Sequence, residues 1–321
     1  MKGSKPKILW VMLSLLLVIT LAAGCSKKTP NDAQQFGDQK SFVLKVPSVV
    51  NPTGPSPYLV GEELGFFAEE GIAFEYVGVV PSSQLVASVV GGKIDVGGAH
   101  VNRTIAGIAA GARVKAVVAN SETTKDVPHM VYVTLEGSPI KTPQDLLGKK
   151  IGIPTIGGCN EYIPYVYLNR FGIDKPNGQV EMVVMPENNL EQALRQGNVD
   201  VIGLHTTADY ILAHGGLKFL FSDWDAFNGN SGGATPSYFS EKFIKEHPEV
   251  VRRFVKAYVK TLNWINANED KALEITVRKA GSKLELIRPT VYAPNGLIKE
   301  ESVTSWIDLL TEFGEIKPGI K

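Results

Sequence analysis

The chain has 321 residues, of which 44% are apolar and 8% aromatic, with 33 basic side chains, 33 acidic side chains and two cysteines. This composition excludes an intrinsically disordered chain, which combines low hydrophobicity with a large net charge, and a disulfide-rich scaffold, which needs many cysteines. The balanced charge also argues against a nucleic-acid partner, because nucleic-acid-binding domains are usually basic. We therefore expect an ordinary folded protein that does not bind nucleic acid.

Residues 1–24 have the features of a secretory signal peptide. Three lysines form a positive n-region, and residues 8–23 form an apolar run that only two hydroxyl residues interrupt. A run of 16 residues is short for a membrane-spanning helix, which needs about 20. The sequence therefore predicts a leader that is removed.

The leader ends in Leu21-Ala22-Ala23-Gly24-Cys25, which resembles the lipobox of bacterial lipoproteins, with the leucine one place upstream of its commonest position. The resemblance implies that Cys25 becomes the lipidated N-terminus and anchors the protein on the extracytoplasmic face of the cell membrane. The alternative is a simple secretory signal with an accidental cysteine. Cleavage before Cys25 leaves 297 residues with a net charge of −3. Residues 25–40 are polar and lack hydrophobic periodicity, so we expect a flexible tether.

An internal repeat organises the folded part. Shifted by 105 positions, residues 81–100 align with residues 186–205 without a gap and with seven identities in 20, where chance gives roughly one. Each copy predicts an amphipathic helix that ends at a glycine, Gly92 or Gly197, followed by a short strand at 94–96 or 199–201. A folded part of this length also exceeds what one hydrophobic core usually serves. We therefore expect two related lobes.

Each half also opens with a strand, a loop and a helix. The strands are predicted at 42–46 and 150–153. Ser56 and Pro57 have the character of an N-cap and a first helical residue. The second helix should begin near Asn160, because Pro164 fits a helix only in its first turn. Alternating strands and helices predict an α/β fold with one parallel sheet in each half.

The last third of the chain is helical in pattern. The predicted helices cover 241–268, divided at Pro248, and 300–313. We expect these helices to pack back on the first lobe.

Three segments carry a resemblance to a known family. Residues 58–72, 92–97 and 138–152 resemble motifs of the nitrate/sulfonate/taurine/thiamine-precursor group of ABC-transporter substrate-binding proteins. The resemblance implies a two-lobed, type II periplasmic-binding-protein fold, in which each lobe is a mostly parallel sheet flanked by helices and the C-terminal helices return to lobe 1. The expected boundaries are 1–24 for the leader, 25–40 for the tether, 41–122 with 223–321 for lobe 1, 128–218 for lobe 2, and crossovers near 120–134 and 218–222.

The resemblance also implies a function without catalysis. Such a protein closes on a small molecule and delivers it to a membrane permease with separate ATPase subunits. We predict no catalytic residue, since the sequence has no HExxH, CxxC, P-loop or nucleophile-elbow pattern. Two alternatives stay open: an enzyme similar to the pyrimidine-precursor synthases of the same family, and a membrane-tethered sensor.

Ligands of parallel α/β sheets bind at the carboxyl ends of strands, where helix N-termini supply N–H donors. This rule predicts a cleft lined mainly by neutral polar and aromatic side chains. The predicted ligand-binding residues are Ser48, Asn51, Thr53, Tyr58, Ser83, Gln84, His100, Asn102, Thr155, Gly158, Cys159, Asn160, Tyr162, Asn188, His205 and Thr206.

Arginine is nearly absent from the predicted cleft. Arg103 is the single arginine in the central loops, so no bidentate clamp for an anion is visible in the sequence. Neutral hydrogen-bonding groups with aromatic faces favour a planar heterocycle such as a pyrimidine, a purine or a flavin-like precursor. A sulfonate, taurine or nitrate-type anion is the alternative ligand.

His100 and His205 occupy equivalent repeat positions, and they could face each other across the cleft. With Cys159 and Glu161 nearby, a Zn or Fe site is chemically conceivable, since imidazole, thiolate and carboxylate all bind these metals. No pair of these residues has a local metal-ligand spacing, however. The sequence therefore predicts neither a metal site nor a cofactor.

Overall fold

The computed structural model describes residues 41–50, 52–174, 178–229, 233–283 and 288–320. The predicted leader, the tether, Cys25 and the predicted ligand residue Asn51 lie outside the described residues.

The first group of elements holds two small sheets. Strands β1 and β2 form a parallel pair, whereas β10 lies between β3 and β4 and is antiparallel to both. The strands are β1 (Phe42–Val46), β2 (Ile72–Tyr76), β3 (Gly97–Gly98), β4 (Val114–Ala119) and β10 (Pro236–Ser240). The helices of this group are α1 (Pro57–Glu63), α2 (Phe66–Glu69), α3 (Leu85–Val90) and α4 (Val101–Ala109), with a 3₁₀ turn at Ser82–Gln84.

Asp95 joins the segment after α3 to β1. Its backbone N–H donates to the Lys45 carbonyl at 2.8 Å, and its carboxylate accepts from the Lys45 N–H at 2.7 Å. These two bonds tie the segment to β1, but β1 pairs with β2 and not with β3, so the expected single sheet is divided. The predicted strand at 94–96 is wrong, and the strand forms only at Gly97 and Gly98.

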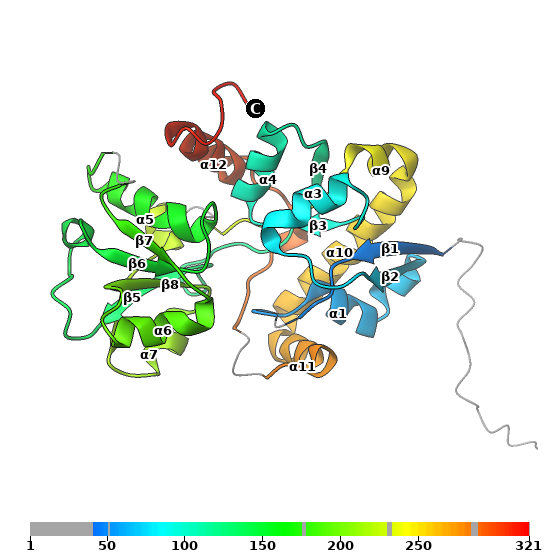
Figure 1. The fold of residues 1–321 in the computed structure, drawn as a ribbon. Helices are drawn as coiled ribbons and strands as arrows, with labels where there is room; N and C mark the ends of the chain where they lie inside the picture. The colour runs from blue at the N-terminus through cyan, green and yellow to red at the C-terminus, as the bar shows by residue number, and fades with distance from the viewer. Residues whose placement is uncertain (1–40, 51, 175–177, 230–232, 284–287, 321) are drawn as a thin grey trace, which may run out of the picture. The chain divides into compact units, whose positions relative to one another are not determined.

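The second group contains a five-stranded sheet of order β7-β6-β8-β5-β9 (Figure 1). The three strands at the β7 edge are parallel, and β5 runs antiparallel to both β8 and β9. The strands are β5 (Val131–Leu135), β6 (Lys150–Ile153), β7 (Glu181–Val184), β8 (Val201–Leu204) and β9 (Leu217–Ser222). Its helices are α5 (Cys159–Arg170), α6 (Glu187–Arg195), α7 (Ala208–Leu212) and α8 (Asp223–Ala226), with a 3₁₀ turn at Pro143–Leu146.

The 105-residue repeat has a structural counterpart in both groups. Gly92 and Gly197 follow α3 and α6 with φ of 72° and 75°, a left-handed conformation that glycine adopts without steric cost. Asp200 repeats the bonding of Asp95, because its carboxylate accepts from the Lys150 N–H at 2.9 Å. In the second copy, the strand begins at Val201, two residues later than predicted.

The C-terminal helices are α9 (Glu241–Glu246), α10 (Pro248–Ala267), α11 (Glu269–Ala280) and α12 (Glu300–Glu312), with a 3₁₀ turn at Pro294–Gly296. Pro248 divides α9 from α10, as expected, and stands at the first position of α10. Fully buried Phe254 and Leu262 join the core around β1 and β2. By contrast, α12 packs on α4 and also places buried Trp306 in the cluster that contains α5. The last helix therefore contacts both groups of elements and not the first alone.

No described helix is both long enough and apolar enough to span a lipid bilayer.

Candidate functional site

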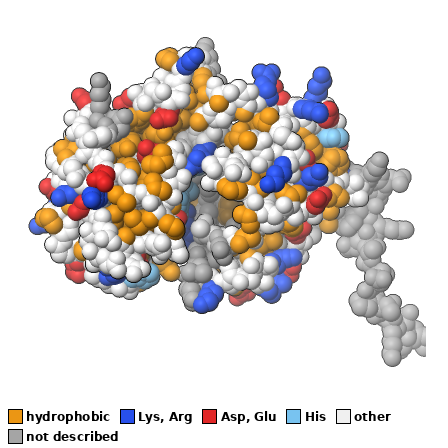
Figure 2. Space-filling model, in the orientation of Figure 1, with side chains coloured by type: hydrophobic (Ala, Val, Ile, Leu, Met, Phe, Trp, Pro, Cys, Tyr) orange, Lys and Arg blue, Asp and Glu red, His pale blue; other side chains and the backbone are white. Residues whose placement is uncertain are grey.

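A cavity of about 510 Å³ lies where loops from both groups of elements meet. The space-filling view shows a hollow between the two groups, with basic and histidine side chains along it (Figure 2). Its lining comes from the loop before α1, the start of α4, the 120–129 connection, the loop before α5, the end of β8, and residues 288–292. Because both groups contribute to it, this cavity is the candidate ligand site.

Seven of the predicted ligand residues line the cavity. They are Thr53, His100, Thr155, Gly158, Cys159, Asn160 and His205. Four of these come from the loop before α5 and its first turn.

Eight predicted residues lie elsewhere in the described chain: Ser48, Tyr58, Ser83, Gln84, Asn102, Tyr162, Asn188 and Thr206. The Ser48 hydroxyl accepts from the Gly78 N–H and ties two loops together. Tyr58 packs edge-on against Phe74 and belongs to the core. Ser83, Asn102 and Tyr162 border a neighbouring hollow. Gln84 ends a 3₁₀ turn, Asn188 is exposed on α6, and Thr206 precedes α7.

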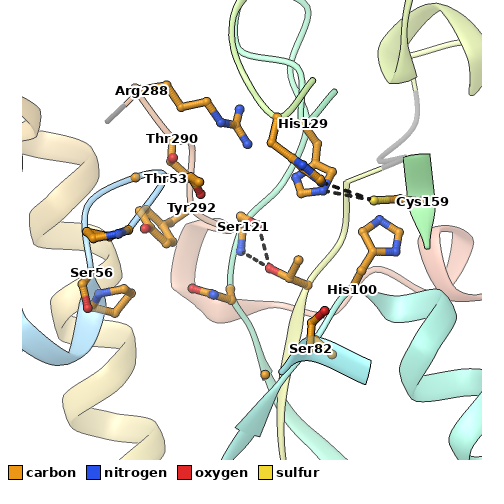
Figure 3. Close-up of a pocket in the computed structure, with 18 of the residues that line it drawn as sticks. Thr53, Ser56, Ser82, His100, Ser121, His129, Cys159, Arg288, Thr290 and Tyr292 are labelled. Atoms are coloured by element: carbon orange, nitrogen blue, oxygen red, sulfur yellow. Dashed lines mark hydrogen bonds between the residues drawn. The ribbon is translucent and has the colours of Figure 1, made fainter. Parts of the chain in front are cut away.

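Cys159 stands at the centre of a group of imidazoles (Figure 3). Its Sγ lies 3.5 Å from His129 Nε2 and 3.7 Å from His205 Nε2. The ring centroid of His100 lies 5.3 Å from that of His129. The structure thus brings together the three residues that the sequence singled out and adds His129 from the connection before β5.

Glu187 orients His205. Its carboxylate accepts the His205 backbone N–H at 2.6 Å and lies 3.1 Å from Nδ1 of the same residue. Burial lowers the pKa of His205, but hydrogen bonds with Cys159 and Glu187, together with their charges, outweigh burial and raise the pKa to about 10. Nδ1 therefore donates to the carboxylate, and Nε2 faces the thiol.

Asn102 orients His100 in a similar way. The Asn102 amide nitrogen donates to the Gly157 carbonyl at 3.1 Å, so its Oδ1 faces His100 Nδ1 at 2.9 Å. The backbone N–H of Asn102 also lies 3.4 Å from Nδ1, but the shorter contact assigns the proton to Nδ1.

His129 contributes a neutral imidazole. Burial lowers its pKa well below the ordinary value, and the charges of His205, His100 and Arg288 lower it further. Its Nε2 points toward Cys159, as Figure 3 shows.

The start of α5 is held by a hydrogen bond from the second sheet. The sequence predicts Pro164 in the first turn of α5, but the residue lies in the second turn. A proline has no N–H, so the carbonyl of Asn160 lacks its usual helical donor. The Tyr132 hydroxyl replaces that donor at 2.8 Å. The proline is therefore accommodated, and Cys159 is fixed one residue before the bonded carbonyl.

Two arginines border the cavity. Arg103 Nη2 donates to the Ile156 carbonyl at 3.2 Å and to Thr155 Oγ1 at 3.3 Å, which joins α4 to the loop before α5. A Cβ on Gly158 would lie 2.5 Å from Asn160 Oδ1 and 3.1 Å from the same guanidinium, so a larger residue here would have to displace these side chains. Arg288 donates to the Pro128 carbonyl at 2.8 Å, and burial lowers its pKa.

Three buried polar atoms of the cavity wall have no hydrogen-bond partner among the described residues. They are Asn120 Oδ1, Asn160 Oδ1 and Arg288 Nε. A buried donor or acceptor without a partner costs about 1–3 kcal/mol. One donor and two acceptors thus lie in the wall without a partner, covered by neighbouring groups in this structure.

Asp223 ties together the connections between the groups. Its carboxylate accepts from the Met130 N–H at 2.9 Å and from the Thr123 hydroxyl. These partners flank the connection between β4 and β5, and Asp223 itself follows β9. Burial raises the pKa of Asp223 to about 6, although both hydrogen bonds and Arg288 act in the opposite direction.

Sequence reasoning missed His129, Arg288, Asn120 and Tyr292, which all line the cavity. None belongs to the repeat or to a strand end that the repeat predicts. Asn120 and His129 lie in the predicted crossover near 120–134. The sequence therefore already indicated that both residues lie beside the cleft. Arg288 and Tyr292 come from the return segment after α11, which carries no comparable pattern.

The family model described as "NMT1/THI5 like" matches residues 53–272. The chain belongs to the NMT1/THI5-like family. It is 23% identical to the formylaminopyrimidine-binding protein of Halalkalibacterium halodurans, over 94% of this chain and 92% of that protein. It is 26% identical to the 4-amino-5-hydroxymethyl-2-methylpyrimidine phosphate synthase of Legionella pneumophila, over 68% of each chain.

Solved structures show the same fold. The periplasmic aliphatic sulphonate binding protein SsuA of Escherichia coli superposes with a TM-score of 0.66 and 18% identity, over 85% of this chain and 88% of that chain. The fold is therefore that of the periplasmic binding proteins, as expected, with sheets flanked by helices.

Proposed function

We propose that this member of the NMT1/THI5-like family is an extracytoplasmic solute-binding protein that captures a pyrimidine-like heterocycle and delivers it to an ABC permease. Lipid attachment at Cys25 would hold it at the membrane. The two predicted lobes would close on the solute around the crossovers near 120–134 and 218–222.

The observation that carries the ligand class is the trio of buried polar atoms without a partner beside the cavity. Each has almost no exposed surface in this structure, so a ligand reaches them only after the wall rearranges as the lobes close. In the closed form, a pyrimidine with an amino substituent would offer N–H donors to Asn120 and Asn160, and its ring nitrogens would accept from Arg288 Nε. A simple sulfonate has acceptors only and leaves both amide oxygens unsatisfied. The formylaminopyrimidine-binding relative supports the same ligand class.

The size of the cavity supports this proposal. Small-molecule sites commonly occupy about 300–1,000 Å³, and the cavity of about 510 Å³ lies within this range. The ring of Tyr292, beside Arg288, provides an apolar face in the same wall.

Calorimetric titration tests the proposal. We expect formylaminopyrimidine or a related aminopyrimidine to bind and taurine not to bind. Asn160→Ala removes one unpartnered acceptor and should weaken pyrimidine binding about 10-fold or more, because a ligand hydrogen bond is lost.

Asn169→Ala is the matched control. Asn169 also lies in α5, and its Oδ1 is also buried without a partner, but it does not line the cavity. We expect this variant to bind like the parent. Equal weakening in both variants, or tight binding of taurine with none of a pyrimidine, would overturn the proposal.

A second candidate ligand is an anion, because Arg103 and Arg288 both border the cavity. The sequence showed only Arg103 there. Two guanidinium groups favour a sulfonate or carboxylate through charge-assisted hydrogen bonds. Taurine binding that is lost in Arg288→Met would favour this candidate.

An enzyme similar to the named synthases, or a membrane-tethered sensor, is the remaining alternative. A binding protein returns its ligand unchanged, so mass spectrometry of the ligand after prolonged incubation separates it from an enzyme. Loss of solute uptake on deletion of the protein separates a transport receptor from a sensor.

A further inference from the structure

We propose that Cys159, His129, His205 and His100 form a binding site for a transition-metal ion of the Zn²⁺ type in the wall of the cavity. The proposal goes beyond solute capture and concerns side chains that a pyrimidine does not need. The ligand atoms of His100, His129 and Cys159 all lie within 4.8 Å of one another, and His205 Nε2 lies 3.7 Å from the same sulfur.

The distances around the sulfur suit tetrahedral coordination. Zn–S and Zn–N bonds of about 2.3 and 2.0–2.1 Å at a tetrahedral angle place the sulfur and each nitrogen about 3.6 Å apart. His129 Nε2 and His205 Nε2 lie 3.5 and 3.7 Å from Cys159 Sγ. Two of the three nitrogen–sulfur distances thus already match an occupied site, and the ligand nitrogen of His100 lies within 4.8 Å of the same sulfur.

Two imidazoles are oriented by an oxygen of a neighbouring side chain. His205 Nδ1 is engaged by the Glu187 carboxylate, and His100 Nδ1 by Asn102 Oδ1. Carboxylate and amide oxygens commonly hold metal-bound histidines in this way, with the other nitrogen on the metal. His205 therefore presents Nε2 toward the thiol, and binding of the ion would displace the proton that His205 carries there.

The donor set selects the class of metal. Imidazole and thiolate suit Zn²⁺ and its neighbours in the transition series, whereas Mg²⁺ and Ca²⁺ prefer oxygen ligands. His100 precedes α4, whereas Cys159 and His205 belong to the elements around the five-stranded sheet. A bound ion would therefore link the two sides of the cavity.

The test uses the protein purified without a polyhistidine tag and stripped with a chelator. We expect calorimetry to show binding of a single Zn²⁺ ion and none of Mg²⁺ under the same conditions. Cys159→Ser and His129→Ala should each weaken Zn²⁺ binding at least about 10-fold, the loss typical of removing even a supporting residue of a metal site.

His214→Ala is the matched control. His214 contacts Glu191 through Nδ1 at 2.8 Å, much as His205 contacts Glu187, but it lies outside the cavity. Its removal should leave Zn²⁺ affinity unchanged. Circular dichroism of each variant establishes that it folds.

A second measurement avoids substitutions altogether. Zn²⁺ should slow alkylation of Cys159 in the parent protein, whereas Mg²⁺ should not. Peptide mass spectrometry measures the extent of alkylation over time. Absence of Zn²⁺ binding, equal affinity in Cys159→Ser, or alkylation of Cys159 that is unaffected by Zn²⁺ would overturn the proposal. Pyrimidine binding is measured separately, so either proposal can fail without the other.

Discussion

The Tyr132 hydroxyl donates a hydrogen bond to the Asn160 carbonyl at 2.8 Å, in the first turn of α5. This carbonyl is the one that Pro164 leaves without a helical donor. One bond from a strand of the second sheet thus compensates for a proline and positions the cavity residues Cys159 and Asn160. The stability of the fold and the geometry of the site are linked at this point.

Tyr132→Phe tests the importance of this bond. The substitution leaves a buried carbonyl without a donor, so we expect the free energy of unfolding to fall by about 1–3 kcal/mol. Urea denaturation measures the change. Tyr238→Phe is the matched control, since Tyr238 is also fully buried but its hydroxyl has no partner. A loss of stability in Tyr238→Phe as large as that in Tyr132→Phe would contradict the interpretation.

The repeat-related aspartates provide a second prediction. Asp95 and Asp200 bond the N–H groups of Lys45 and Lys150, which are also 105 positions apart. Asp95→Ala and Asp200→Ala should therefore destabilise the protein by similar amounts, about 1–3 kcal/mol each. Chemical denaturation of both variants makes the comparison. A loss in one variant and none in the other would show that the two carboxylates are not equivalent.

Asp223 gives the expected pH dependence. Because burial raises its pKa to about 6, the folded state keeps a proton that the unfolded state releases near pH 4. The free energy of unfolding should therefore fall as pH rises from about 4 to 6, by at most about 1.4 kcal/mol per pH unit from this group. Asp223→Asn removes this contribution.

Urea denaturation between pH 4 and pH 7 tests this sign. The stability of Asp223→Asn relative to the parent should increase across the interval and then level off above it. A difference that does not change with pH would show that Asp223 ionises alike in both states.

Cys25 is the basis of the predicted membrane attachment. Cys25→Ser removes the residue that a lipobox requires, so we expect the protein to move from the membrane fraction to the soluble fraction. Fractionation followed by immunoblotting measures the distribution. Retention of the variant at the membrane would refute lipid attachment at this residue.

The repeat made much of the fold predictable. The strands β1 and β6, the glycine ends of α3 and α6, and the division at Pro248 follow from local patterns and agree with the structure. The strands after the glycines were placed too early, because each begins only after an aspartate, Asp95 or Asp200, whose carboxylate accepts from the backbone N–H of a lysine 50 residues earlier. This bond is a tertiary contact that no local pattern contains.

The candidate site was only partly predictable for the same kind of reason. Cys159 and His205 lie at strand ends and helix starts, where parallel sheets bind ligands. Arg288 reaches the cavity from a segment 129 residues beyond Cys159 in the chain. Its placement depends on how the return segment crosses the cavity, and neither composition nor periodicity specifies that path.

Native mass spectrometry of the protein purified from its own cells tests the central claim most directly. The account predicts a bound aminopyrimidine in the parent and in Asn169→Ala, and its loss in Asn160→Ala, where the cavity has lost an acceptor. A bound sulfonate, or the same heterocycle retained equally by Asn160→Ala, would contradict it.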